Sequence, residues 1–240
     1  MSALPRPDPG QTDLPRRDDE ARARLRAVAE QARPLTLARS RTLAVPGPLG
    51  ELLPGRGLRR GTVVGVDGAP GAGATSVAFS LAAAATAAGE WAAAIDLTGT
   101  LGAEAAAAAG VVLDRFPVVR LADGPASRWA TSVAALLDGV GLVLAEVPPH
   151  VRAADARRLI ARARERGGVL VVLGNRWPGT TAVTLVAEGG PWSGPDEERD
   201  PVDGQEEDRV SVLPVRTLRV QVTGRGEAAR TRHGALASSA

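Results

Sequence analysis

The chain has 240 residues, including 29 arginines but no lysine, cysteine or tyrosine, and its formal net charge is only +2. The pI near 10.6 reflects the lack of groups that titrate between about pH 7 and 12, so it is no evidence for a basic surface. The composition excludes disulfides, thiol catalysis and cysteine zinc sites, and it excludes Schiff-base lysines. With His150 and His233 as the only histidines, we expect no metal site.

The first 20 residues contain no apolar signal region, and the apolar stretches are broken by glycine or charge. We therefore expect no secretory signal and no membrane span, and a soluble cytoplasmic protein. Residues 1–16 are rich in proline and aspartate, which predicts disorder. Within residues 17–32 the apolar residues recur at helical spacing and form a narrow stripe. This pattern predicts a helix that ends before Pro34. Residues 44–61 resemble a connector punctuated by proline and glycine.

Buried strands then alternate with helices, which predicts an α/β fold with a mostly parallel sheet. The expected strands are 62–67, 91–96, 116–121, 141–147, 169–174 and 181–188. The expected helices are 75–89, 101–109, 126–139 and 151–166. With so few aromatic residues, the core must be built from alanine, valine and leucine.

The alternation stops at 189–209, where the segment PDEERDPVDGQEEDR carries eight acids against two arginines. We interpret 189–209 as an acidic disordered insertion. Within 210–223, which we expect to hold the closing strands, Thr217–Thr223 alternates apolar and polar residues. Residues 224–240 resemble a basic flexible tail. The expected division is therefore 1–44, 45–188, 189–209, 210–223 and 224–240.

The most informative motif is GAPGAGATS, Gly68 to Ser76, between an expected strand and an expected helix. Its spacing matches the phosphate-binding loop G-x-x-x-x-G-K-[ST], but Ala74 occupies the lysine position. The residues of this loop that we single out are Gly68, Gly71, Gly73, Ala74, Thr75 and Ser76.

No cation occurs from Gly61 to Asp114, a stretch that carries five acids. A triphosphate with about four negative charges is poorly accommodated there unless arginine comes from elsewhere in the chain or from a partner. A structural turn is the favoured interpretation, with weak nucleotide or Mg²⁺ binding and ATP hydrolysis as alternatives. We expect no catalytic residue and no obligatory cofactor.

At this point the sequence resembles the RecA-like superfamily and, within it, the ImuA family of actinobacterial SOS accessory proteins. RGTVVGVDGAPGAGATSVAFSLAAAA is similar to the segment that carries the Walker A loop, and VGLVLAEVP is similar to the Walker B strand. The segments NRWPGTTAVTLVAE and LRVQVTGRG resemble the closing strands of ImuA-type proteins. Against RecA, Thr98 stands at the position of the catalytic glutamate, and the Walker B acid is shifted to Glu146.

The resemblance implies a RecA-like core at 45–188 and a non-catalytic adaptor in damage-induced translesion synthesis. Its implied partners are a Y-family-like ImuB protein and an error-prone replicative-type DNA polymerase, with DNA or RecA as further candidates. One alternative is a RecA-like ATPase whose missing cation is supplied in trans. The other is a SulA-like inhibitor of cell division.

Two arginine-rich segments are candidate partner or DNA surfaces, although a solvated helix face is the favoured interpretation of the first. On helix 151–166 these residues are Arg157, Arg158, Arg162 and Arg164. Near the C-terminus they are Arg209, Arg216, Arg219, Arg225, Arg230 and Arg232.

The tryptophans and His150 complete the candidates. We interpret Trp91 and Trp129 as packing residues, and Trp177 and Trp192, which flank loops, as candidate anchors for a partner. His150 follows two prolines, which favours a solvated loop residue over a catalyst.

Overall fold

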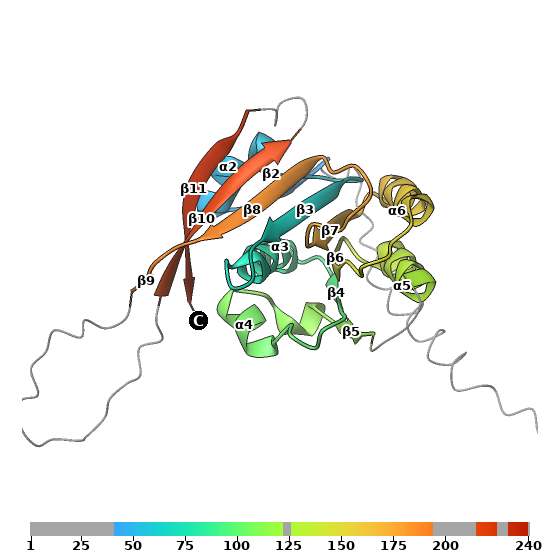
Figure 1. Ribbon diagram of the computed structural model, residues 1–240, viewed down its shortest axis with the longest axis horizontal. Helices are drawn as coiled ribbons and strands as arrows, with labels where there is room; N and C mark the ends of the chain where they lie inside the picture. The colour runs from blue at the N-terminus through green and yellow to red at the C-terminus, as the bar shows by residue number, and fades with distance from the viewer. Residues whose placement is uncertain (1–40, 122–125, 194–214, 225–229, 240) are drawn as a thin grey trace, which may run out of the picture.

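The computed structural model describes residues 41–121, 126–193, 215–224 and 230–239 (Figure 1). The predicted helix at 17–32 lies outside these residues. So do residues 194–214, which include most of the acidic segment and the first residues of the expected closing strands.

Most of the described chain is organised around one sheet of nine strands. In chain order the strands are β3 (Val63–Gly68), β4 (Ala92–Asp96), β5 (Val118–Arg120), β6 (Leu142–Glu146), β7 (Val169–Leu173), β8 (Val183–Gly189), β9 (Trp192–Ser193), β10 (Val215–Gly224) and β11 (Arg232–Ser239). Their spatial order is β11-β10-β8-β3-β7-β6-β4-β5, and β9 pairs with β10. The pairs from β8 to β5 are parallel, whereas β10 pairs antiparallel with β8, β9 and β11. The expected α/β fold with a mostly parallel sheet is confirmed.

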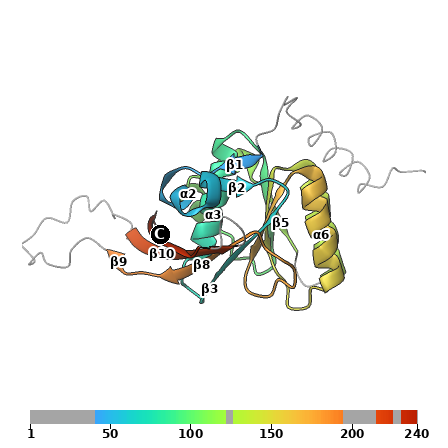
Figure 2. The ribbon, with the colours of Figure 1, turned by 90° about the horizontal axis from the view of Figure 1, so that it is seen from above.

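Helices cover both faces of the sheet, as the view from above shows (Figure 2). They are α2 (Gly47–Leu52), α3 (Ala74–Ala87), α4 (Ala103–Ala108), α5 (Ala126–Gly139) and α6 (Ala153–Arg166), with short 3₁₀ turns η1 (Pro54–Arg56) and η2 (Leu113–Arg115). On one face lie α2, α3 and α4, and on the other lie α5 and α6. Among the helices described, none is long and apolar enough to cross a membrane.

The core is built largely from alanine, valine and leucine, as the composition predicts. Strands β4, β6 and β7 bury apolar side chains toward both helical layers, which explains why they are continuously apolar in sequence. Alanines of α3 lie directly on the sheet, and this close approach leaves room for few large side chains. Phe79 and Phe116 fill the remaining space with an edge-to-face contact at 6.1 Å between ring centroids.

The segment 44–61, predicted to be a connector, is instead a folded part of the core. β1 (Thr42–Ala44) pairs antiparallel with β2 (Gly57–Arg59), and α2 lies between them. Leu43, Leu49 and Leu58 are buried. Prolines and glycines interrupt the sequence around these leucines, so no helical or strand periodicity can be recognised there. The segment is stabilised by burial against the distant sheet rather than by its local sequence preferences.

The C-terminal predictions also need correction. The tail expected from 224 contains β11, which pairs with β10 along most of its length. The Arg232 guanidinium donates to the carbonyl oxygens of Leu52 and Leu53, which fixes β11 to α2. The proposed insertion at 189–209 starts too early, because Gly189 belongs to β8 and Trp192–Ser193 forms β9. The expected strand at 217–223 is confirmed and extends over Val215–Gly224.

Candidate functional site

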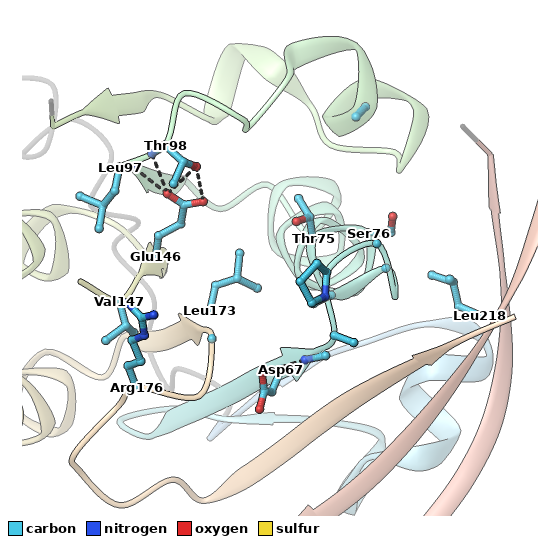
Figure 3. A pocket seen from close by; sticks show the side chains of 18 of the residues that line it. Asp67, Thr75, Ser76, Leu97, Thr98, Glu146, Val147, Leu173, Arg176 and Leu218 are labelled. Atoms are coloured by element: carbon cyan, nitrogen blue, oxygen red, sulfur yellow. Dashed lines mark hydrogen bonds between the residues drawn. The ribbon is translucent and has the colours of Figure 1, made fainter. Parts of the chain in front are cut away.

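A pocket of about 700 Å³ opens at the carboxyl ends of β3, β6 and β7, beside the start of α3. Ligands of α/β proteins commonly bind at this edge of the sheet. The pocket brings together Glu146 and the six loop residues that the sequence analysis singled out (Figure 3). Its apolar lining includes Leu97, Val147, Pro148, Pro149, Leu173 and Leu218.

The loop between β3 and α3 is shaped by two glycines in the left-handed region, Gly71 at φ +75° and Gly73 at φ +96°. The Ala72 amide donates to the carbonyl oxygen of Ala69 at 2.8 Å, which closes the turn. A Cβ atom added to Gly73 would lie 2.5 Å from the Leu218 side chain, whereas one added to Gly71 would meet nothing within 4 Å. Thus Gly73 is required by both backbone conformation and packing.

The start of α3 keeps several features of an anion site. The first amides of a helix have no acceptor within the helix, and Thr75 and Ser76 stand beside them in the pocket wall. Ala74, the first residue of α3, contributes no charge. Asp67 at the end of β3 accepts from the Gly68 amide at 2.8 Å, which places a carboxylate next to the loop.

The opposite wall of the pocket is held together by Glu146, at the end of β6. Its Oε2 accepts from the amides of Leu97 and Thr98 at 2.6 and 3.1 Å. The Thr98 hydroxyl donates to the same carboxylate, 3.0 Å from Oε1 (Figure 3). Glu146 and Thr98, the two residues that the sequence analysis compared with catalytic positions of RecA, are therefore hydrogen-bonded to one another.

A second carboxylate, that of Asp96, also holds this wall in place. Asp96 is buried, and its Oδ1 accepts from the amides of Gly99 and Thr100 at 2.7 and 3.2 Å. Its Oδ2 lies 3.7 Å from Nε of Arg120. Together Asp96 and Glu146 bind the amides of residues 97–100, so the loop after β4 is held by two carboxylates.

The pocket contains two arginines from distant parts of the chain. Arg216, on β10, donates to the carbonyl oxygen of Gly190 at 3.0 Å and also to the carbonyl oxygen of Gly71 in the loop. Arg176 follows β7 and is exposed. The charges of these arginines balance those of Asp67 and Glu146. Arg216 was predicted only as part of a basic surface, and Arg176 was missed, because only the tertiary fold brings them to the loop.

The other predicted arginines lie away from the pocket. On α6, Arg157, Arg158 and Arg164 are exposed, but Arg162 is bonded to Asp138 of α5 at 2.5 and 2.6 Å. The hydrogen bond to Asp138 raises the pKa of Arg162. The apolar stripe of α6 packs against the sheet as expected.

Near the C-terminus, Arg219 and Arg230 are exposed and Arg232 is bonded to the backbone of α2 and the residue that follows it. Arg209 and Arg225 lie outside the described residues.

Trp177, a candidate anchor for a partner, is half-buried and packs against the core. Its ring contacts that of buried Trp129 edge to face at 6.4 Å between centroids. Trp129 is confirmed as a core residue. The side chain of Trp192 lies outside the described part of the chain. Residue His150 is exposed, as expected for a loop.

Comparison with known proteins places the chain in a family. The model of a family described as the MT3502 N-terminal domain matches residues 51–179, more than half of the chain. The matched segment contains the whole loop, Glu146 and Arg176, but it ends before β8 and β10. No curated protein matches the sequence. The chain belongs to the MT3502 N-terminal domain family.

Proposed function

We propose that this chain is a non-catalytic adaptor of the ImuA type, built on a RecA-like core whose phosphate loop persists as architecture. It acts through protein contacts in a damage-induced translesion synthesis assembly with an ImuB-like protein and an error-prone polymerase. The sheet order, the position of the loop and the motifs at 61–86 and 140–148 support the RecA-like part of the proposal.

The bonding of Glu146 carries the proposal. In a phosphoryl-transfer site the acid at this position faces Mg²⁺, and a lysine neutralises the charge on the phosphates. Here both carboxylate oxygens of Glu146 accept hydrogen bonds from residues 97 and 98, and Ala74 replaces the lysine. Releasing Glu146 for a metal would leave the Leu97 and Thr98 amides without their acceptor.

The direct test is ATP turnover by the purified full chain with Mg²⁺ present. We expect no hydrolysis above the protein-free blank, and no gain from Ala74→Lys, because the acid is already engaged. Glu146→Gln is the matched control, since it keeps the shape and one carbonyl oxygen of the side chain. Turnover by the wild type that Glu146→Gln abolishes, with an unchanged thermal midpoint, contradicts the proposal.

A genetic test separates the adaptor from a division inhibitor. Deletion is expected to lower damage-induced mutagenesis, while overproduction leaves cell length unchanged. Filamentation on overproduction without DNA damage would instead favour the SulA-like alternative.

A second candidate function, nucleotide binding without hydrolysis, is favoured by one observation. Arg216 reaches the loop from β10 and lines the same pocket as Thr75 and Ser76, so the chain itself supplies a cation near the loop. Titration calorimetry with ATP or pyrophosphate tests this function. Binding that Arg216→Ala weakens about tenfold, and Arg219→Ala leaves unchanged, would support it. Absence of heat at millimolar ligand would exclude it.

A further inference from the structure

The large apolar side chains that the described residues expose all stand in the short segment from the end of α4 to β5 (Figure 1). Val112, Leu113 and Val118 are 41%, 45% and 40% exposed. Phe116, between them, is buried against Phe79 of α3, so the segment is held in place. Helix α4 adds small exposed side chains, Ala103, Ala105, Ala107 and Ala108. We refer to all these exposed side chains as the α4–β5 surface; an apolar surface of this kind commonly marks a contact site.

The N-terminal part of the chain joins the described body close to this surface. The carbonyl oxygen of Arg41, the first described residue, accepts from the Arg60 amide at 2.9 Å. The Arg60 guanidinium in turn pairs with Glu90, with 3.0 Å between Nη1 and Oε2. The carbonyl oxygen of the neighbouring Gly89 accepts from the guanidinium of Arg115, within the segment of the α4–β5 surface. A short series of contacts therefore leads from the point of entry to this surface.

The point of entry and the α4–β5 surface also lie on the same face of the sheet. Strand β1 follows Arg41 directly, and its Leu43 belongs to the core cluster that includes α3. Val111, at the start of the surface segment, belongs to the same cluster. The Val112 amide donates to the hydroxyl of Thr86 on α3 at 3.1 Å. A segment that precedes Arg41 can therefore reach the surface without crossing the sheet.

The sequence before Arg41 contains a segment of suitable length and pattern. The predicted helix at 17–32 is about 24 Å long, and a helix of this length is only marginally stable alone in water. The eight residues 33–40 extend over at most about 26–29 Å, enough to follow the contacts from Arg41 to Arg115. The apolar stripe of the predicted helix consists of Ala21, Leu25, Val28, Ala29 and Ala32. Its mostly small side chains permit close approach to the alanines of α4.

We propose that residues 17–32 of the same chain form the predicted helix and dock by their apolar stripe on the α4–β5 surface. The stripe then covers Leu113 and Val112, and its alanines lie against α4. The short connection gives the segment an effective concentration in the millimolar range, which a second copy or a separate partner must exceed to take its place. The inference does not depend on the proposed adaptor function.

The charges favour this segment over an occupant that is merely apolar. From the first to the last residue of the α4–β5 surface, the exposed charged side chains are two carboxylates, Glu104 and Asp114. Residues 21–29 contain three arginines and no acid. Helical spacing places Arg22 and Arg26 along one border of the apolar stripe. The docked helix therefore brings positive charge to a surface whose exposed charges are negative.

Hydrogen exchange of the full chain, followed by mass spectrometry, tests the docking. We expect the amides of residues 21–32 to exchange at least tenfold more slowly than in an unstructured peptide. Leu113→Arg should reduce this protection about tenfold, because it places a charge in the apolar contact. Ala161→Arg is the matched control, since it puts the same side chain on an exposed position of α6, on the other face of the sheet. Unprotected exchange in the wild type, or equal loss in both variants, overturns the proposal.

A reciprocal pair of variants changes the segment and leaves the described body intact. Leu25→Asp places a carboxylate on the apolar stripe, whereas Ala23→Asp places one on the opposite side of the predicted helix. We expect Leu25→Asp to lose about tenfold in protection over residues 21–32 and Ala23→Asp to keep most of it. Equal exchange in the two variants contradicts docking by the stripe.

Cross-linking distinguishes docking within one chain from docking on a second copy, because the natural chain has no cysteine. In a chain that carries both Leu25→Cys and Leu113→Cys, a short bismaleimide should link the two thiols within the monomer at a rate that does not depend on protein concentration. A mixture of the two single variants should form cross-linked dimer at least tenfold more slowly at micromolar concentration. Dimer formation as fast as the internal link would make a second copy the occupant and overturn the proposal.

Discussion

The two walls of the pocket are built from different parts of the chain. One wall is made by the strand ends of β4 and β6, where the Glu146 carboxylate binds the amides of Leu97 and Thr98. The other wall is made by β10, whose Leu218 packs on Gly73 and whose Arg216 donates to Gly71. The first wall lies within the segment that matches the family model and the second lies beyond it.

The difference between the walls lies in how each one contacts the loop after β3 or the loop after β4. In the first wall, a carboxylate accepts hydrogen bonds from the backbone of the loop after β4. In the second, a late strand supplies an apolar contact and a cation to the loop. Glu146, Leu218 and Arg216 therefore each make a contact that holds this part of the fold, and each can be removed separately to measure its contribution.

The largest effect is expected at the contact between Gly73 and Leu218. Gly73→Ala should lower the free energy of unfolding by about 3 kcal/mol, because it combines left-handed strain with overpacking against a buried leucine. Gly71→Ala is the matched control: its backbone is also left-handed but its Cβ meets nothing, so about 1 kcal/mol is expected.

Urea denaturation of the two variants gives both values. The excess cost at Gly73 should disappear when Leu218→Ala is present, because the steric contact is then gone. Equal costs for the two glycines in the wild-type background would show that Leu218 moves aside freely.

The opposite wall is tested at Glu146. Glu146→Ala should cost about 2 kcal/mol, since it removes a charged acceptor and leaves the part-buried Leu97 amide and the exposed Thr98 amide without it. Thr98→Val, which removes only the hydroxyl donor, should cost about 1 kcal/mol. Thermal and urea unfolding measure both. Costs below about 0.5 kcal/mol for both variants would mean that the wall does not depend on this carboxylate.

Much of the parallel half of the fold could be predicted from the sequence, because its strands are buried on both faces and are read as short apolar runs bounded by glycine. The β1–α2–β2 segment could not, since its leucines are separated by prolines and glycines and are buried by distant strands. Nor could β11, whose RHGALASS sequence contains a single buried leucine, Leu236, and is held by pairing with β10.

The site residues that are adjacent in sequence could be predicted, whereas those that come from distant parts of the chain could not. The loop Gly68–Ser76 follows from spacing alone, and Glu146 from the strand that precedes it. Arg216 and Leu218 reach the loop across roughly 140 residues of chain, and neither carries a local pattern that points there. The exposure of Val118 was likewise hidden, because the sequence indicates a strand but not that it lies at the edge.

The smallest effect is expected at Arg216. Arg216→Ala should cost about 1 kcal/mol, because the guanidinium bonds two carbonyl oxygens, Gly190 and Gly71, at a half-buried site. Arg219→Ala, three residues further along β10 and exposed, should change stability by less than about 0.5 kcal/mol.

The loss at Arg216 should be local, since the bond to Gly71 joins β10 to the loop rather than to the sheet. Hydrogen exchange should therefore quicken at residues 69–73 in Arg216→Ala while the amides of β4 and β6 keep their protection. Uniform exchange across both walls would instead mean that the two walls unfold together.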